Sequence, residues 1–303
     1  MIKRTLFFGN PAYLSLRNEQ LVVKLTDAQT QEEVVKTVPI EDVGVVVLED
    51  RQITITNGVM DALLKNNCAV ITCNEKHMPT GLLLPLEGHT LQSERFAQQI
   101  EASLPLKKQL WQQTVQAKIR NQGVLLKRLY NAENRCMLAW SNDVKSGDSE
   151  NFEGRAAAYY WKYMFPNDEV FKRDREGNAP NNLLNYGYAI LRAVIARALV
   201  ASGLLPTLGI HHHNRYNAFC LADDIMEPYR PYVDEVVAEI MRDGIDCEEL
   251  TTEVKKRLLV IPVREVHING QRSPLMVAVT QTTASLAKCF SGELRKIVYP
   301  EMQ

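Results

Sequence analysis

The chain has 303 residues, of which 46% are hydrophobic and 23% charged, and its formal net charge is −1. These values exclude a disordered chain and leave room for one large or two modest folded domains. The six cysteines form no Cys-x-x-Cys pair, so we interpret them as reduced thiols of a cytoplasmic protein. The first apolar run is too short for a signal peptide, and we expect no membrane span.

The first part of the chain has the pattern of β-structure. Short runs rich in β-branched and aromatic residues alternate with turn formers, and one short helix is expected at residues 57–66. The expected strands cover residues 5–8, 13–16, 21–25, 43–48 and 69–72. We therefore predict an N-terminal β domain over residues 1–88.

From residue 91 onward the pattern becomes helical. Residues 183–202 are apolar nearly all round but contain two arginines, so we expect a buried helix and not a membrane span. The other expected helices cover residues 104–130, 131–144, 147–165, 219–227, 232–242, 248–259 and 284–295, with a loop over 166–182. The fold class predicted is α+β, with residues 89–303 forming a larger all-α catalytic domain.

Basic side chains gather in one part of this region. Residues 91–131 hold seven basic and two acidic side chains. Such a stripe on an otherwise neutral protein is typical of phosphate binding, although a solvated helix face gives the same pattern. Lys118 and Arg120 are two positions apart, so on a helix they point to nearly opposite sides and one duplex should touch only one of them.

Glu153 is the first candidate for chemistry. One helical turn further on lie Ala156 and Ala157, whose small side chains leave space above the carboxylate for a metal ion or a phosphate. A glutamate in the first turn of a helix also interacts favourably with the helix dipole, which is the purely structural alternative.

A second cluster begins with three internal histidines, His211, His212 and His213, and continues to an acidic segment. Asp223 and Asp224 lie four and three residues before Glu227, so all three acids share a helix face. Like charges this close repel, which suggests a nearby cation; helix capping by these residues is the structural alternative. One imidazole with two carboxylates suits Mg²⁺ or Mn²⁺, and the nitrogen favours Mn²⁺.

The chain resembles the CRISPR-associated adaptation integrases (Cas-one), in their type II form. The motifs are spread over most of its length. They are residues 10–16 (Asn-Pro-Ala-Tyr-Leu-Ser-Leu), 73–79 (Cys-Asn-Glu-Lys-His-Met-Pro), 118–122 (Lys-Ile-Arg-Asn-Gln), 153–157 (Glu-Gly-Arg-Ala-Ala), 208–212 (Leu-Gly-Ile-His-His) and 224–231 (Asp-Ile-Met-Glu-Pro-Tyr-Arg-Pro).

The resemblance implies which residues bind the metal. The metal glutamate falls on Glu153, the histidine after a Gly-x-x step on His212, and the third ligand on Glu227, with Asp224 as an auxiliary acid. It also implies a homodimer whose N-terminal domain takes part in dimerisation and DNA contact. The basic residues expected to contact DNA are Lys118, Arg120, Arg155 and Arg215.

The reaction implied is transesterification, in which a 3′-hydroxyl of a short captured DNA attacks a phosphodiester of a CRISPR repeat. The partners implied are double-stranded DNA, a small dimeric adaptation protein and further type II CRISPR proteins. Two other functions stay open at this point: a metal-dependent nuclease that only hydrolyses DNA, and a non-catalytic DNA-binding scaffold.

Overall fold

The computed structural model describes residues 3–26, 32–166, 171–174 and 176–303, and the chain divides into two compact units, Met1–Gly88 and His89–Gln303. Part of the predicted loop over 166–182 lies outside the described residues.

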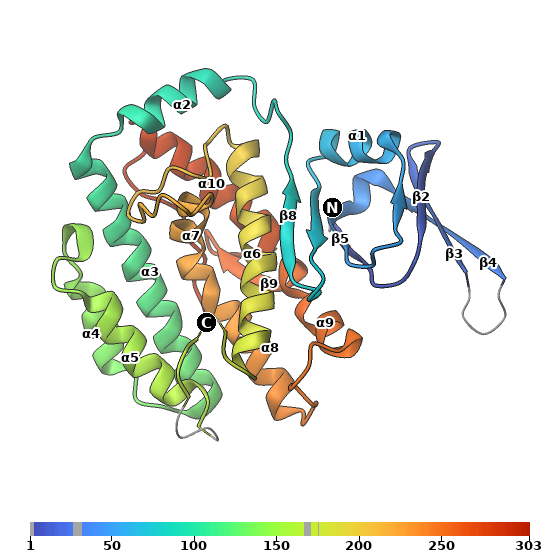
Figure 1. Ribbon diagram of the computed structural model, residues 1–303. Coiled ribbons are helices and arrows are strands. Elements are labelled where there is room, and N and C mark those ends of the chain that lie inside the picture. The colour runs from blue at the N-terminus through green and yellow to red at the C-terminus, as the bar shows by residue number, and fades with distance from the viewer. Residues whose placement is uncertain (1–2, 27–31, 167–170, 175) are drawn as a thin grey trace. The chain divides into compact units, whose positions relative to one another are not determined.

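The first unit is built on two four-stranded sheets (Figure 1). One has the order β1-β5-β7-β8, in which β5 pairs in parallel with both neighbours; the other has the order β4-β3-β2-β6. The elements are β1 (Arg4–Phe8), β2 (Tyr13–Arg17), β3 (Gln20–Thr26), β4 (Glu33–Pro39), β5 (Val43–Leu48), β6 (Thr54–Ile55), α1 (Asn57–Lys65), β7 (Ala69–Cys73) and β8 (Pro79–Leu83), with a 3₁₀ turn at Ile40–Asp42.

The first unit has its own hydrophobic core. Strand β5 is a nearly continuous run of valines, and its first five residues are buried, as expected for a strand covered on both faces. Leu14, Leu21 and Val59 belong to the same buried cluster and are fully inaccessible. This packing accounts for the β-rich N-terminal domain that the sequence predicts.

The second unit is mostly helical (Figure 1). Its longest helix, α3 (Leu104–Tyr130), packs against α4 (Arg135–Asp143) and α5 (Phe152–Met164). The remaining helices are α2 (Gln92–Glu101), α6 (Asn181–Ala201), α7 (Cys220–Met226), α8 (Arg230–Arg242), α9 (Thr252–Leu258) and α10 (Leu275–Phe290), with 3₁₀ turns at Ser146–Asp148, Glu227–Tyr229 and Ile261–Val263.

Helix α6 is the central helix of this unit. By length and composition it could cross a membrane, but 78% of its apolar window is buried inside the fold. It packs against α7, α8 and α10. The prediction of a buried core helix over residues 183–202 is confirmed, with a start two residues earlier.

The C-terminal part of the second unit corrects two predictions. Strands β9 (Glu265–Ile268) and β10 (Gln271–Pro274) form an antiparallel hairpin, so the unit is not all-α. The last helix is α10 and not residues 284–295. It begins directly after Pro274, which ends the hairpin. Its first two turns contain Val277, Val279 and Thr280, which also suit strands, so the start of the helix is not evident from the sequence.

Candidate functional site

The candidate residues come from helices α3, α5 and α7, from the 3₁₀ turn after α7, and from the loop before α7 that carries the histidines. Glu153 lies in the first turn of α5, and Glu227 begins the 3₁₀ turn between α7 and α8. Asp148 fixes the start of α5, because its carboxylate accepts hydrogen bonds from the backbone N–H groups of Phe152 and Glu153 at 2.9 Å each. Asn151 caps the same helix end by accepting from the N–H of Gly154.

Lys118 joins the two predicted metal glutamates. Its ammonium lies 2.7 Å from Glu153 Oε1 and 2.6 Å from Glu227 Oε2. The residue is only 8% exposed, because it faces the interior from α3. The sequence predicted that Lys118 or Arg120 contacts a DNA phosphate. In this structure the Lys118 ammonium is engaged by the two acids, and its role toward DNA stays a prediction.

Glu227 is held by two cations. Arg230 Nε donates to its Oε1 at 2.9 Å, and Lys118 approaches the other oxygen without the geometry of a hydrogen bond. Burial by itself would raise the pKa of Glu227, but the charges of Arg230 and Lys118 outweigh it and lower the pKa to about 2. The carboxylate is therefore ionised at neutral pH, and its buried Oε2 faces the Lys118 ammonium.

Asp224 organises the histidine turn. It is fully buried, and its carboxylate accepts from the backbone N–H groups of Ile210, His211 and His212 at 2.7, 3.0 and 3.3 Å. Gly209 allows this approach, since a Cβ there would lie 2.4 Å from the His212 carbonyl oxygen and 2.8 Å from Asp224 Oδ2. The glycine of the Gly-x-x-His motif thus has a steric reason.

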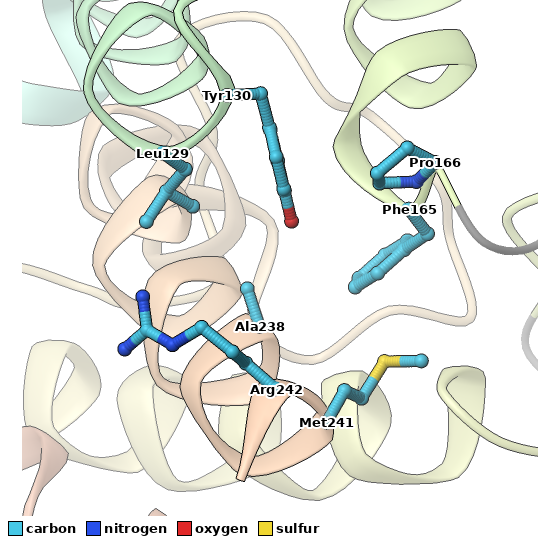
Figure 2. A pocket seen from close by; sticks show the side chains of 7 residues that line it. All are labelled: Leu129, Tyr130, Phe165, Pro166, Ala238, Met241 and Arg242. Carbon is cyan, nitrogen blue, oxygen red and sulfur yellow. The ribbon is translucent and has the colours of Figure 1, made fainter. Parts of the chain in front are cut away.

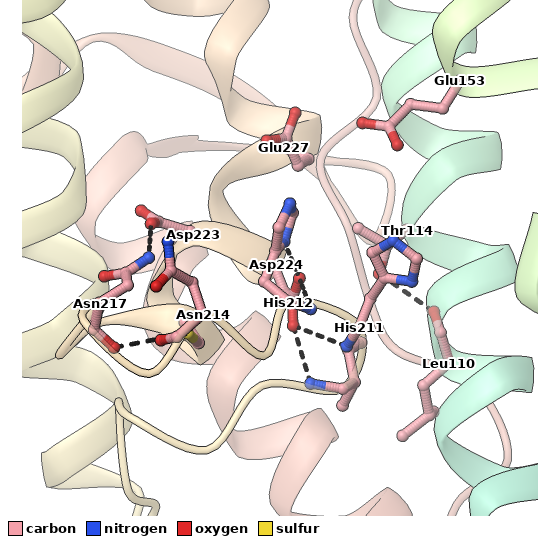
Figure 3. Close-up of polar contacts among 12 residues, drawn as sticks. Leu110, Thr114, Glu153, His211, His212, Asn214, Asn217, Asp223, Asp224 and Glu227 are labelled. Atoms are coloured by element: carbon pink, nitrogen blue, oxygen red, sulfur yellow. Dashed lines mark hydrogen bonds and ion pairs between the residues drawn. The ribbon is translucent and has the colours of Figure 1, made fainter. Parts of the chain in front are cut away.

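The same carboxylate orients the His212 ring. Asp224 Oδ1 lies 2.5 Å from His212 Nδ1, and this hydrogen bond raises the pKa of His212. Because Asp224 engages Nδ1, a ligand would bind the other ring nitrogen, Nε2, which Figure 3 shows on the side of the ring that faces Glu227. A carboxylate behind a ligating histidine is a common arrangement in metal sites.

The other two histidines lie differently. The ring of His211 stacks on Trp111 with centroids 4.1 Å apart and planes 2° apart, and partial burial lowers its pKa. His213 is exposed. Asp223 accepts hydrogen bonds from the side chains of Arg192 and Asn217, neither of which contacts Asp224 in the hydrogen bonds described above.

These contacts correct one argument from the sequence. The acids were expected to repel one another unless a cation lay nearby, but the chain supplies a counter-charge or donor for each of them. Asp223 has Arg192, Asp224 has three backbone N–H groups, and Glu227 has two cations. Proximity of the acids along the helix is therefore not by itself evidence for a metal.

The side chains of Glu153, His212 and Glu227 are of the types that bind a divalent ion, but they are not arranged closely enough to hold one. Among the described residues, no group of three His, Cys, Asp or Glu side chains is close enough to hold a metal ion. The ammonium of Lys118 lies between Glu153 and Glu227. The donor set itself, two carboxylates and an imidazole nitrogen, suits such an ion.

The predicted DNA-contacting arginines are all exposed. Arg120 has an amide partner in Asn142 at 3.4 Å. Arg155 lies over the Phe152 ring at 4.8 Å, close to Glu153 in sequence, and Arg215 lies over Tyr216 at 4.6 Å. Their role toward DNA stays a prediction.

A separate cavity lies at the far end of α3 (Figure 2). Its volume is about 280 Å³. Tyr130, which lines it, is twelve residues beyond Lys118, so it is about 18 Å away along the helix axis. The lining residues are Leu129, Tyr130, Phe165, Pro166, Ala238, Met241 and Arg242. The cavity therefore lies apart from the carboxylates.

Solved structures share this architecture. A casposase bound to an integration product superposes with a TM-score of 0.79 at 20% identity, covering 98% of this chain and 92% of the other. A CAS1 protein from Thermotoga maritima gives a TM-score of 0.74 at 15% identity, covering 99% and 100%. These likenesses define the class of fold: a β-rich unit followed by a helical one.

The family follows from the sequence comparisons. The model of the family "CRISPR associated protein Cas1" matches residues 6–260. A CRISPR-associated endonuclease Cas1 of Neisseria meningitidis is 36% identical over 287 residues, covering 94% of this chain and 91% of the relative. A Cas1 endonuclease of Pyrobaculum aerophilum is 28% identical over 263 residues, covering 82% and 88%. The chain belongs to the Cas1 family, which confirms the resemblance found in its motifs.

Proposed function

We propose that this chain is a divalent-metal-dependent DNA integrase of CRISPR adaptation. It joins the 3′-hydroxyl of a short captured DNA to a CRISPR repeat by transesterification. The observation that carries the proposal is that the Glu153 and Glu227 carboxylates both contact the buried ammonium of Lys118. Beside them lies His212, whose Nδ1 is held by Asp224, so that Nε2 is left to bind a ligand. The casposase named above, which was solved with an integration product, supports joining as the reaction.

Glu153, His212 and Glu227 would hold Mg²⁺ or Mn²⁺. When bound, such an ion would activate the attacking hydroxyl and stabilise negative charge on the phosphate oxygens. Asp224 keeps a proton on His212 Nδ1 and thereby leaves the Nε2 lone pair available. Arg230 keeps Glu227 ionised and fixes its orientation.

A solved relative supports one of the proposed partners. A solved Cas6-RT-Cas1–Cas2 complex contains a similar chain, with a TM-score of 0.74 over 99% of this one, and this supports a small Cas2-type partner. Double-stranded DNA, a second copy of the chain, further type II proteins and a cytoplasmic location belong to the same proposal. Arg120, Arg155 and Arg215 are the exposed side chains assigned to DNA phosphates.

A strand-transfer assay tests the proposal. A duplex labelled near its 3′-end is incubated with a repeat-containing plasmid, the purified chain and Mg²⁺ or Mn²⁺, with the Cas2-type partner added or withheld. We expect label in the plasmid, loss of joining with EDTA, and loss of joining in Glu153→Gln. Label released only as shorter fragments would favour the hydrolytic nuclease that the relatives' name also suggests. Binding without either product would favour a scaffold.

A further inference from the structure

Lys118 is an unusual residue for the buried face of a helix. Helix α3 directs Trp111, Val115, Lys118, Gln122 and Leu125 toward the interior at spacings of three and four residues. Four of these positions carry uncharged side chains, and the fifth carries an ammonium. A buried lysine is costly unless it is paired, and here the pairing comes from two different glutamates.

The ammonium lies where a shared metal ion would lie. A divalent cation bound by both glutamates must contact one oxygen of each at about 2.0–2.2 Å. The ammonium nitrogen already lies 2.7 and 2.6 Å from one oxygen of each. Two cations cannot occupy this space together, because their like charges repel strongly in a buried position.

We propose that Lys118 acts as a built-in counter-cation that occupies the metal position between Glu153 and Glu227 and leaves it when the metal binds. This inference rests on the proposed function, because it concerns the same metal site. The released ammonium stays within reach of the site and is then free to pair with a DNA phosphate there. Lys118 is thus a positioning residue that preserves the two acids in the metal-free protein and lowers metal affinity.

Metal affinity of the full chain tests this competition. Mn²⁺ binding is measured for the wild type, Lys118→Met and Lys127→Met. The readouts are calorimetry and the loss of the electron paramagnetic resonance signal of free Mn²⁺. Lys127 is an exposed lysine on the same helix, so its substitution controls for the change in net charge. We expect Lys118→Met to bind Mn²⁺ at least tenfold more tightly, equivalent to about 1.4 kcal/mol, and Lys127→Met to bind within twofold of the wild type.

The outcomes separate the two proposals. Wild-type binding together with equal or weaker binding by Lys118→Met overturns the role of Lys118 and leaves the metal site standing. Absence of binding in all three proteins overturns the metal site and this inference with it.

A second measurement uses only the wild type, so it does not depend on the folding of a variant. The protein is treated briefly with acetic anhydride with and without Mg²⁺, and acetylation of Lys118 is quantified by mass spectrometry relative to Lys127. Because Lys118 is 8% exposed and engaged by two carboxylates, we expect slow labelling without metal and several-fold faster labelling with it. An unchanged ratio would show that the ammonium does not leave its position.

Discussion

Asp224→Asn isolates the residue that organises the histidine turn. The substitution keeps the size of the side chain but removes the charge and replaces one acceptor oxygen by a donor group. In the unsubstituted protein, the fully buried Asp224 carboxylate accepts hydrogen bonds from three backbone N–H groups and contacts one ring nitrogen, His212 Nδ1. An amide can accept from some of these donors, but its NH₂ group must face the rest.

The magnitude follows from these contacts. A hydrogen bond to a charged acceptor contributes about 1 kcal/mol more than a neutral one, so three backbone donors imply a loss of about 3 kcal/mol. For a unit of this size that corresponds to a fall in melting temperature of about 6–12 °C. The effect on metal binding has a separate cause: the amide NH₂ can donate to Nδ1 of His212, which moves the ring proton to Nε2 and removes the ligand lone pair.

The assay compares Asp224→Asn with Asp223→Asn. The adjacent residue undergoes the same chemical change, but it pairs with the side chains of Arg192 and Asn217 and with no backbone turn. We expect Asp224→Asn to lower Mn²⁺ affinity and strand joining by about 10–100-fold, as for other residues behind a metal ligand, and the control to change both little. Thermal unfolding and calorimetry supply the readouts. Equal melting temperatures and equal affinities in the two variants would refute the role of Asp224.

Three further predictions concern neighbouring residues. Glu227→Gln should abolish joining and also destabilise the metal-free protein by about 3–5 kcal/mol in denaturant unfolding, because Arg230 loses its buried partner; unchanged stability would contradict this. Gly209→Ala should reduce joining more than tenfold, because the new Cβ would collide with backbone. Gly58→Ala in α1, where a Cβ would make only an ordinary contact with Leu16 Cβ at 4.0 Å, should be neutral or slightly stabilising. Burial raises the pKa of Asp234 to about 6 despite hydrogen bonds from two tyrosines. The folded protein therefore holds this proton more tightly than the unfolded chain, so ionisation of Asp234 costs about 3 kcal/mol of stability as pH rises from about 4 to 6. Asp234→Asn should remove that dependence, and parallel stability–pH curves for variant and wild type would disprove it.

The sequence predicted the two-part organisation because hydrophobic period and turn residues act locally. The short β-branched runs before residue 88 and the long helical runs after it are visible without tertiary information. The steric role of Gly209 was not among the predictions, because it depends on the approach of the Asp224 carboxylate and of the His212 carbonyl oxygen. Which side chains meet across helices is a different matter, because it depends on packing.

Lys118 illustrates that limit. The absence of acids between residues 101 and 133 led us to interpret the helix as a phosphate-binding surface. The partners of Lys118 are 35 and 109 positions away in the sequence, so its pairing was invisible in the local pattern. A signal was nevertheless present: the residue falls in the apolar stripe with Trp111, Val115 and Leu125, where a lysine needs a buried counter-charge.

The hairpin after residue 264 was missed for another reason. Its turn contains Asn269 and Gly270, both with positive φ, a strong local signal for a tight hairpin. The flanking strands are only four residues long. The first alternates between polar and apolar residues, but the second contains no large apolar residue, so the pattern is too short to stand out. The expectation of a purely helical domain therefore passed over a signal that the sequence contained.

Because Trp111 stacks on His211, its fluorescence can report on the site. The same indole meets the His212 ring edge-on at 5.7 Å, so its surroundings change when either imidazole moves or changes charge. The two other tryptophans, Trp140 and Trp161, contact aromatic rings of α5. Replacing those two with phenylalanine would leave one emitting ring beside the histidines. The arrival of an ion or a DNA end could then be followed in real time in an unlabelled protein.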